Sequence, residues 1–255
     1  MSYESKYAFV SSKTTGVLTL SITNVSDDIC LSPLNSENSN SHAIRAAYLS
    51  WGYLIRKSVS YFLDIDSSEL TVGFYITPQT KKAEIFFVEQ LENGAGYCNY
   101  LSGRKYKDVP LKAIIMPLIE NGEIYKSLVS NHHQEDCTSS CYDCIRDYSN
   151  QNIHHLPDRR LGLDLARLSY DSNSKIDFTV SYWREYITNT IKNVLLKHKY
   201  IVEEVKDTLI GIDPYGENYC LVHPFWSAKK ISKLIGSLPG HYKTISIFDI
   251  SKLKN

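Results

Sequence analysis

The residues of this sequence with the clearest capacity for chemistry are three cysteines within eight positions, Cys137, Cys141 and Cys144. The two residues between Cys141 and Cys144 allow both sulfur atoms to reach one metal ion from a tight turn, and Cys137 adds a third thiolate. His133 lies shortly before them and supplies an imidazole nitrogen. A Cys₃His set is typical of closed structural zinc sites, which have no open position for water. We therefore predict that these four residues bind Zn²⁺.

Two alternatives to this ligand set stay open at the level of sequence. The three cysteines can be buried thiols without a metal, although the segment around them is strongly polar and a poor place to bury free thiols. The fourth ligand can also be a residue other than His133. The other candidates are His132, His154, His155 and Cys98. A disulfide is disfavoured, because clustered cysteines in an intracellular protein are more often metal ligands.

The charge and hydropathy pattern excludes several classes of protein. The 255 residues include 28 Lys and Arg and 28 Asp and Glu, so the formal net charge is zero. Such a chain has no overall field that attracts DNA or RNA, and nucleic-acid contact has to be local or provided by a partner. Residues 1–10 lack a signal-peptide pattern, and no apolar run approaches the roughly 18 residues of a membrane span. We expect a soluble cytoplasmic protein without membrane contact.

Apolar periodicity predicts the elements that position the cysteine cluster. Apolar residues recur at helical spacing over residues 42–63, and Ser41 is a suitable N-cap for this amphipathic helix. The cluster is expected in a loop between a helix at 110–119 and a leucine-rich helix. That second helix has Leu161, Leu165 and Leu168 on its apolar side and Asp164 and Arg167 at polar positions. The other elements predicted here are strands at 14–24, 69–76 and 84–88 and a helix at 97–101.

A polar, irregular segment at residues 171–176 divides the chain into two predicted parts, 1–170 and 171–255. The second part is predicted to contain a helix, three strands, a helix and a final strand. These elements are expected at residues 182–198, 200–205, 208–212, 219–223, 228–238 and 244–250. The pattern predicts an α+β protein: a mixed sheet with packed helices and a zinc-binding loop, followed by a smaller C-terminal αβββαβ-like part.

Several spaced motifs around the cysteines resemble a known family. They are Cys137-x₃-Cys141-Tyr142-x-Cys144, Asp147-Tyr148-x-Asn150-Gln151, Asp158-x-Arg160-x-Gly162-Leu163 and, upstream, Asn93-Gly94-Ala95-Gly96-Tyr97. Their order and spacing are similar to those of the helicase-associated MrfA-like zinc-binding domain, over roughly residues 14–170. That domain occurs at the C-terminus of a class of DNA-repair helicases and in DrmB, a component of the DISARM anti-phage system.

This resemblance implies a zinc-binding structural role beside a helicase, in DNA repair or antiviral defence. The chain has no G-x-x-x-x-G-K-[ST] phosphate loop, so we expect that it does not hydrolyse ATP itself. Where the family leads us to expect an aspartate before the glycine turn, this chain has Glu89. We predict a non-catalytic, zinc-stabilised accessory module of a helicase-based DNA-processing or anti-phage defence complex. The expected partner is a helicase or another defence-system subunit, with DNA reached through the complex.

Two groups of basic residues are candidates for nucleic-acid contact. Arg104, Lys105 and Lys107 lie close to tyrosines that can stack on bases, although a solvated surface turn has the same pattern. Arg159 and Arg160 open the leucine-rich helix, where they can contact phosphate or pair with their neighbours. The glycine turn at residues 92–97 can bring backbone N–H groups to a phosphate, but it lacks a full dinucleotide-binding fingerprint and also fits a simple strand-to-helix turn.

The C-terminal part supports an alternative function, a divalent-metal-dependent nuclease. Its predicted order of elements is similar to the core of restriction-endonuclease-like enzymes, which hold Mg²⁺ with an acid on one strand and a Glu-x-Lys on the next. Asp213 is the candidate for the first acid, but residues 220–223 of the next strand are Cys-Leu-Val-His. The aromatic pair Phe225 and Trp226 ends that strand and is predicted either as a partner contact or as core packing.

Overall fold

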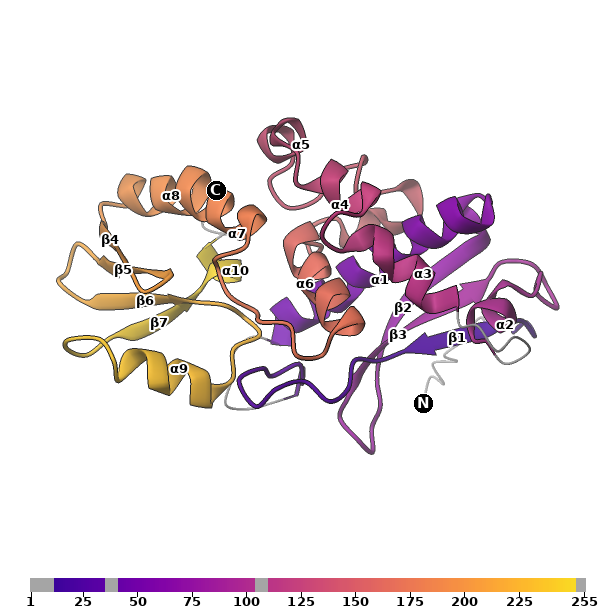
Figure 1. The fold of residues 1–255 in the computed structure, drawn as a ribbon, viewed down its shortest axis with the longest axis horizontal. Helices are drawn as coiled ribbons and strands as arrows, with labels where there is room; N and C mark the ends of the chain where they lie inside the picture. Colours follow the sequence, from indigo (N-terminus) through magenta and orange to yellow (C-terminus); the bar gives the residue numbers. More distant parts are fainter. Residues whose placement is uncertain (1–11, 35–40, 104–109, 251–255) are drawn as a thin grey trace, which may run out of the picture.

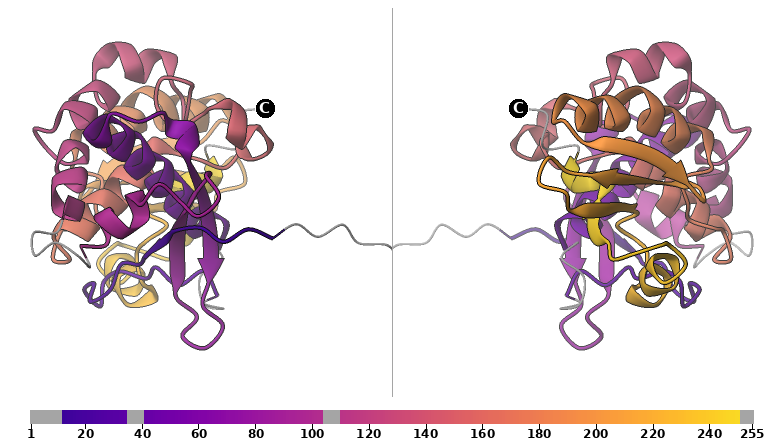
Figure 2. Two further views of the ribbon diagram at one scale, coloured as in Figure 1. Left: turned by 90° about the vertical axis from the view of Figure 1, so that its right-hand side faces the viewer. Right: turned by 90° about the vertical axis from the view of Figure 1, so that its left-hand side faces the viewer.

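The computed structural model describes residues 12–34, 41–103 and 110–250, which are organised around two β-sheets (Figure 1). The first sheet is antiparallel, in the order β1 (Val17–Leu20), β3 (Ala83–Glu89), β2 (Leu70–Ile76). The second runs β4 (Ile201–Val205), β5 (Thr208–Ile212), β6 (Asn218–Val222), β7 (Lys243–Ser246), and only its last pair is parallel. The α+β class is therefore confirmed, and the mixed sheet is the second one. The β2–β3 turn at residues 77–82 projects from the body of the molecule (Figure 2).

Helix α1 (Ser41–Leu63) lies at the centre of the larger part. It packs on β2 and β3 and on α6 (Arg159–Tyr170), so residues such as Trp51 are buried along much of its length. Gly162 lets the two helices approach closely, because a Cβ atom there would lie only 2.9 Å from Leu54 Cδ1. The helix predicted at 42–63 is confirmed, with Ser41 as its first residue rather than as its N-cap.

A row of short helices connects the first sheet to the cysteine cluster. They are α2 (Tyr97–Leu101), α3 (Pro110–Ile115), the 3₁₀ helix η2 (Met116–Leu118), α4 (Glu123–Leu128) and α5 (Asn131–Asp136). The helix predicted at 110–119 changes to 3₁₀ geometry near Pro117, which lacks a backbone N–H and restricts the residue before it. The three cysteines lie in a loop before α6, as predicted, but two helices that were not predicted, α4 and α5, precede that loop, and α5 carries His133. A further 3₁₀ helix, η3 (Tyr148–Ile153), follows the cysteines.

The C-terminal part begins with one interrupted helix. The π-helical segment η4 (Ile187–Ile191) joins α7 (Ser181–Tyr186) to α8 (Lys192–Lys197), which confirms the helix predicted at 182–198. Strands β4 to β6, helix α9 (Ala228–Ile235) and β7 follow, and α8 and α9 lie on opposite sides of the second sheet (Figure 1). The predicted αβββαβ order is confirmed. The last strand is shorter than expected, because α10 (Ile247–Ile250) takes up its final residues.

A buried carboxylate joins the two parts of the chain. Asp164 of α6 is fully buried, and its oxygens accept hydrogen bonds from the Tyr182 hydroxyl (2.6 Å) and from Trp183 Nε1 (2.7 Å). His223 Nε2 lies 3.0 Å from the same carboxylate, and its Nδ1 accepts a hydrogen bond from the Phe225 N–H, which assigns the proton to Nε2. The expectation that Asp164 stands among the polar positions of this helix is therefore wrong. Its spacing from the leucines of α6 places it on their buried face.

Phe225 and Trp226 belong to the core. Their exposed fractions are 0% and 4%, and Trp226 Nε1 donates a hydrogen bond to the Ile176 carbonyl oxygen (2.7 Å). A single β-bridge pairs Trp226 with Ile29 of the N-terminal part. Of the two roles predicted for this aromatic pair, core packing is the one observed.

Replacing Asp164 with leucine should destabilise both parts together. The substitution leaves the donors of Tyr182, Trp183 and His223 without an acceptor, so the free energy of unfolding should fall by about 3–5 kcal/mol. Urea titration followed by tryptophan fluorescence and by circular dichroism measures this loss, and both signals should change in one transition. The matched control is Glu203→Leu, which removes an exposed carboxylate from β4 and should change stability by less than about 0.5 kcal/mol. Two separate transitions would contradict the joint unfolding.

Candidate metal centre

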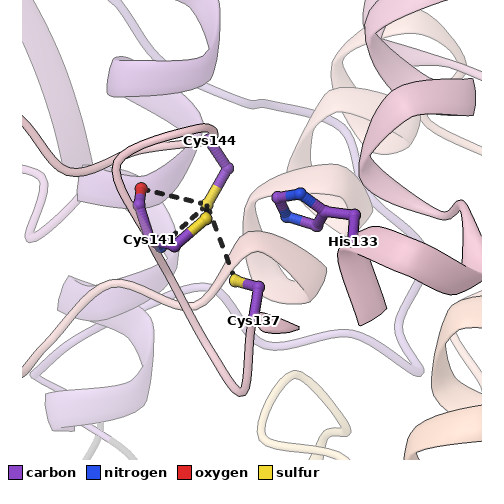
Figure 3. Close-up of side chains that lie close together, drawn as sticks. All are labelled: His133, Cys137, Cys141 and Cys144. Atoms are coloured by element: carbon purple, nitrogen blue, oxygen red, sulfur yellow. Dashed lines mark hydrogen bonds between the residues drawn. The ribbon is translucent and has the colours of Figure 1, made fainter. Parts of the chain in front are cut away.

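His133 and the three cysteines converge from helix α5 and the loop that follows it (Figure 3). Ser130 caps this helix, and its Oγ accepts a hydrogen bond from the His133 N–H (3.3 Å). At the other end, the Cys137 N–H bonds to the His133 carbonyl oxygen (2.9 Å). This bond holds the two residues one helical turn apart, so their side chains lie on the same side of the helix.

A tight turn positions the other two cysteines. The carbonyl oxygen of Cys141 accepts hydrogen bonds from the N–H groups of Cys144 (3.2 Å), Ile145 (3.1 Å) and Arg146 (2.9 Å). The Cys141 N–H in turn donates to Cys144 Sγ (3.0 Å). Cys144 Sγ thereby lies 3.6 Å from Cys141 Sγ and 3.8 Å from Cys137 Sγ. One nitrogen of His133 and the three sulfurs all lie within 4.8 Å of one another.

This geometry fits a tetrahedral metal ion. With a zinc–sulfur bond of about 2.3 Å, two sulfurs of a tetrahedral site lie about 3.8 Å apart, which agrees with the sulfur distances around Cys144. His133 gives a second indication, because its Nε2 atom is buried and has no hydrogen-bond partner among the described residues. A buried polar atom of this kind requires an explanation, and an ion held between it and the sulfurs provides one. Thiolate and imidazole ligands together suit zinc-like divalent ions.

The thiols of the cluster share their protons unevenly. The hydrogen bond from the Cys137 thiol, against the effect of burial and aided by bonds from Cys141, lowers the pKa of Cys144 to about 5. The same bond with Cys144, together with burial, raises the pKa of Cys137. Burial also raises the pKa of Cys141. Because a metal binds the thiolate form, the Cys137 and Cys141 thiols would have to give up their protons to hold one.

The rival candidates for the fourth ligand have other positions and contacts. His132 and His155 are exposed. His154 Nε2 lies 2.7 Å from Asn150 Oδ1 and is held by that amide. Cys98 belongs to α2 and is buried against the first sheet. Within the part of the chain that the structure describes, the group able to hold a metal consists of the four residues predicted from the sequence.

Two arginines in the first turn of α6 support the cluster. Arg159 is 1% exposed, and its Nη1 donates to the Cys137 carbonyl oxygen (2.7 Å). Arg160 is equally buried, donates to the Thr138 carbonyl oxygen (2.7 Å) and pairs with Asp158 (2.7 Å). Local pairing, one of the two roles that the sequence left open, is observed for Arg160, whereas Arg159 bonds to backbone carbonyl oxygens; neither guanidinium lies at the surface. The other basic candidates, Arg104, Lys105 and Lys107, lie outside the described residues.

A carboxylate of the protein occupies the glycine turn. Glu89 is buried at the end of β3, and its oxygens accept hydrogen bonds from the N–H groups of Ala95, Gly96 (2.8 Å) and Cys98 (2.8 Å). Gly94 has a φ of +72°, and a Cβ atom there would lie 2.9 Å from Glu89 Oε2. The N–H groups that a phosphate could have used are therefore already bonded. Burial, together with the Glu89 charge, raises the pKa of Cys98 to about 12.

Asp213, the candidate acid of the nuclease alternative, stabilises the β5–β6 turn. Its Oδ1 accepts hydrogen bonds from the N–H groups of Tyr215 and Glu217, both at 2.9 Å. The Glu217 carboxylate is exposed and pairs with Lys243. On the next strand Cys220 is fully buried. The observed contacts of Asp213 are those of an Asx turn.

Comparison with known proteins gives two matches. Residues 51–145 match the family model described as the MrfA Zn-binding domain, which confirms the resemblance for this segment and includes all four candidate ligands. Druantia protein DruE of Escherichia coli (strain UMEA 4076-1) is 29% identical over 145 residues. That similarity covers 53% of this chain and 7% of the relative, so the chain corresponds to a small part of a much longer protein. No solved structure matches the chain.

Replacing Cys144 with serine should remove the metal and destabilise the protein. Cys144 Sγ lies within 3.8 Å of both other sulfurs, and a closed site contributes its binding free energy to folding. We expect metal content well below one ion per chain and a loss of about 3 kcal/mol or more, which lowers the melting temperature by roughly 6–12 °C. Elemental analysis and thermal denaturation measure the two effects.

The matched control for this variant is Cys220→Ser. It makes the same chemical change at a buried cysteine of β6 that is outside the cluster. This control can lose stability but should keep its metal. Equal metal content in both variants would exclude Cys144 as a ligand.

Proposed function

We propose that this protein is a non-catalytic, zinc-stabilised accessory module of a helicase-based DNA-processing or anti-phage defence complex. The observation that carries the proposal is the cluster of three sulfurs around the unpartnered Nε2 atom of His133. Its position in a segment that matches the MrfA Zn-binding domain supports zinc as the ion. The similarity to Druantia protein DruE supports the defence setting. The family that the sequence motifs resemble also occurs in the DISARM anti-phage system and in DNA-repair helicases, so these are the two cellular processes that the resemblance implies.

In this proposal zinc has a structural role. Bound to Cys137, Cys141, Cys144 and His133, it supplies a cross-link between α5 and the loop, and four protein ligands leave no open position for water. Two of the residues that would hold the ion are shielded from solvent: Cys137 and Cys144 are 1% and 5% exposed, and His133 and Cys141 are half-buried. The thiols have to stay reduced to bind it, which favours a cytoplasmic location. None of the described helices is long and apolar enough to cross a membrane.

We further propose that residues 1–170 form the zinc-binding unit and residues 171–255 a smaller C-terminal unit. The two are joined by the Asp164 hydrogen bonds and by the bridge between Ile29 and Trp226. Because these contacts are buried, the C-terminal unit is expected to stay docked rather than to move as a tethered domain.

An apolar groove offers a surface for the partner. It lies between the C-terminal half of α1 and the segment from η2 to α4, and its volume is about 520 Å³. Tyr61 and Met116 line it and are 76% and 52% exposed, which is high for large apolar side chains. We propose that a helicase or another defence-system subunit docks on this groove. DNA is then bound through the complex, in keeping with the zero net charge of the chain.

A divalent-metal-dependent nuclease is the alternative, and the αβββαβ order of the C-terminal part favours it. The zinc module is the stronger proposal because its four ligands are already assembled. The nuclease would instead need Asp213 to leave its turn and a second acid to join it.

The purified protein should lack ATPase activity and should bind DNA only weakly. With no net positive charge, we expect dissociation constants in the nonspecific range of about 10⁻⁴–10⁻⁶ M that weaken further as salt is raised. Fluorescence anisotropy with single-stranded and duplex oligonucleotides measures binding. The same oligonucleotides incubated with Mg²⁺ should stay intact. Cleavage that disappears in Asp213→Ala would instead support the nuclease alternative.

Introducing a charge into the groove should weaken partner binding while the fold stays intact. Met116→Asp places a carboxylate on the exposed apolar surface, and we expect at least a tenfold loss of association, about 1.4 kcal/mol or more. The tagged protein is isolated from its native host, and a co-purifying helicase is identified and quantified by mass spectrometry. Leu196→Asp, at a 50% exposed apolar position on α8, is the control. A helicase recovered equally with both variants would exclude the groove.

A further inference from the structure

Arg159 is a buried cation with no carboxylate partner in contact. Its Nε donates to the Leu128 carbonyl oxygen (3.2 Å) and its Nη1 to the Cys137 carbonyl oxygen (2.7 Å). Among the described residues no carboxylate oxygen lies within 4.0 Å of its guanidinium, because neighbouring Asp158 pairs with Arg160. A buried charge without a counter-ion costs several kcal/mol in solvation. The fold keeps this arginine at 1% exposure nevertheless.

Among the described residues, the sulfur cluster is the group in direct contact with the Arg159 guanidinium that becomes anionic, whereas Asp158 acts on it from beyond contact distance. Nη1 lies 3.5 Å from Cys137 Sγ. Three thiolates, a neutral imidazole and a divalent ion together leave one net negative charge on a Cys₃His centre. The side of the centre that faces Arg159 is buried, since Cys137 and Cys144 are 1% and 5% exposed, whereas Cys141 and His133 are half-buried.

We infer that Arg159 is the counter-ion of the metal-loaded Cys₃His centre and that it strengthens metal binding through its charge. The inference rests on the proposed zinc site. Each buried charge offsets the solvation cost of the other, so the arginine favours the loaded centre, in which the thiols have lost their protons. Arg159 is thus a positioning residue, which acts on the ion through Cys137.

The backbone sets this contact in place. The Arg159 N–H donates to the Ser139 carbonyl oxygen (2.9 Å), which fixes the start of α6 against the loop between Cys137 and Cys141. The planar guanidinium then reaches the Leu128 carbonyl and both the carbonyl and the sulfur of Cys137. A lysine keeps the charge but cannot make these contacts in the same fixed geometry.

Arg160 provides a matched control on the same helical turn. It is buried to the same extent, but its guanidinium bonds to Thr138 and Asp158 and stacks on Tyr186, 3.4 Å from the ring centroid. It already has a carboxylate counter-ion, and its guanidinium makes no hydrogen bond to a sulfur among the described residues. Replacing Arg160 therefore removes a buried arginine but keeps the positive charge of Arg159 beside the sulfur cluster.

The experiment measures zinc affinity of the full chain by competition with a chromophoric chelator. Arg159→Gln keeps a hydrogen-bonding side chain and removes the charge, and we expect binding about 10–100-fold weaker than in the wild type. Arg159→Lys should stay within about tenfold of it. Arg160→Gln should change zinc affinity much less than Arg159→Gln. Should Arg159→Gln fail to fold, the comparison of Arg159→Lys with Arg160→Gln provides the test.

Cobalt(II) in place of zinc gives a second measurement, which reports on the sulfurs rather than on folding. Loss of the nearby positive charge raises the energy of the sulfur lone pairs, so the sulfur-to-cobalt absorption band of Arg159→Gln should move to longer wavelength. An unmoved band, with zinc affinity reduced equally in Arg159→Gln and Arg160→Gln, would overturn the inference and leave the zinc site standing. Wild-type protein that binds no zinc would overturn the proposed function itself.

Discussion

The first turn of α6 is the point on which the rest of the structure depends. The Asp158 N–H donates to Ser50 Oγ of the central helix α1 (2.8 Å), and the next residue, Arg159, bonds to the cysteine loop through its backbone and its side chain. Arg160 stacks on Tyr186 of α7, so the C-terminal part meets the same turn. Because these contacts are buried and largely polar, they hold only when every partner is in place. The loop that carries the three cysteines is therefore supported by elements from both parts of the chain.

The candidate ligands could be predicted from the sequence because they are close together along the chain, and spacing alone limits what their side chains can reach. The sequence could not exclude His132 in favour of His133. What distinguishes the two side chains is helix α5, which has six residues and is too short to show a periodic pattern in the sequence. The role of Arg159 could not be predicted at all. Its burial results from packing between α6 and segments distant in sequence, and a sequence shows only that an arginine is present.

The long, periodic elements of the fold were equally predictable, and α1 is the clearest case. Errors arose where tertiary packing decides. The sequence alone places Asp164 among the polar positions of its helix, but in the structure its carboxylate is surrounded by Tyr182, Trp183 and His223. One signal was available: an acid at helical spacing from Leu161 and Leu168 lies on the apolar face and needs partners there. The short helix α10, which replaces the end of the last strand, gave no comparable signal.

The carboxylate of Glu89 limits how this region of the protein can change during evolution. It reaches across the turn to three backbone N–H groups, and an aspartate, shorter by about 1.5 Å, could keep those bonds only if the turn moved toward β3. Gly94 leaves no space for a side chain in that direction. The two positions are therefore not independent. A descendant that acquires the shorter acid is viable only with a rebuilt turn, so substitutions at position 89 and in the turn at 93–96 should appear in the same lineages.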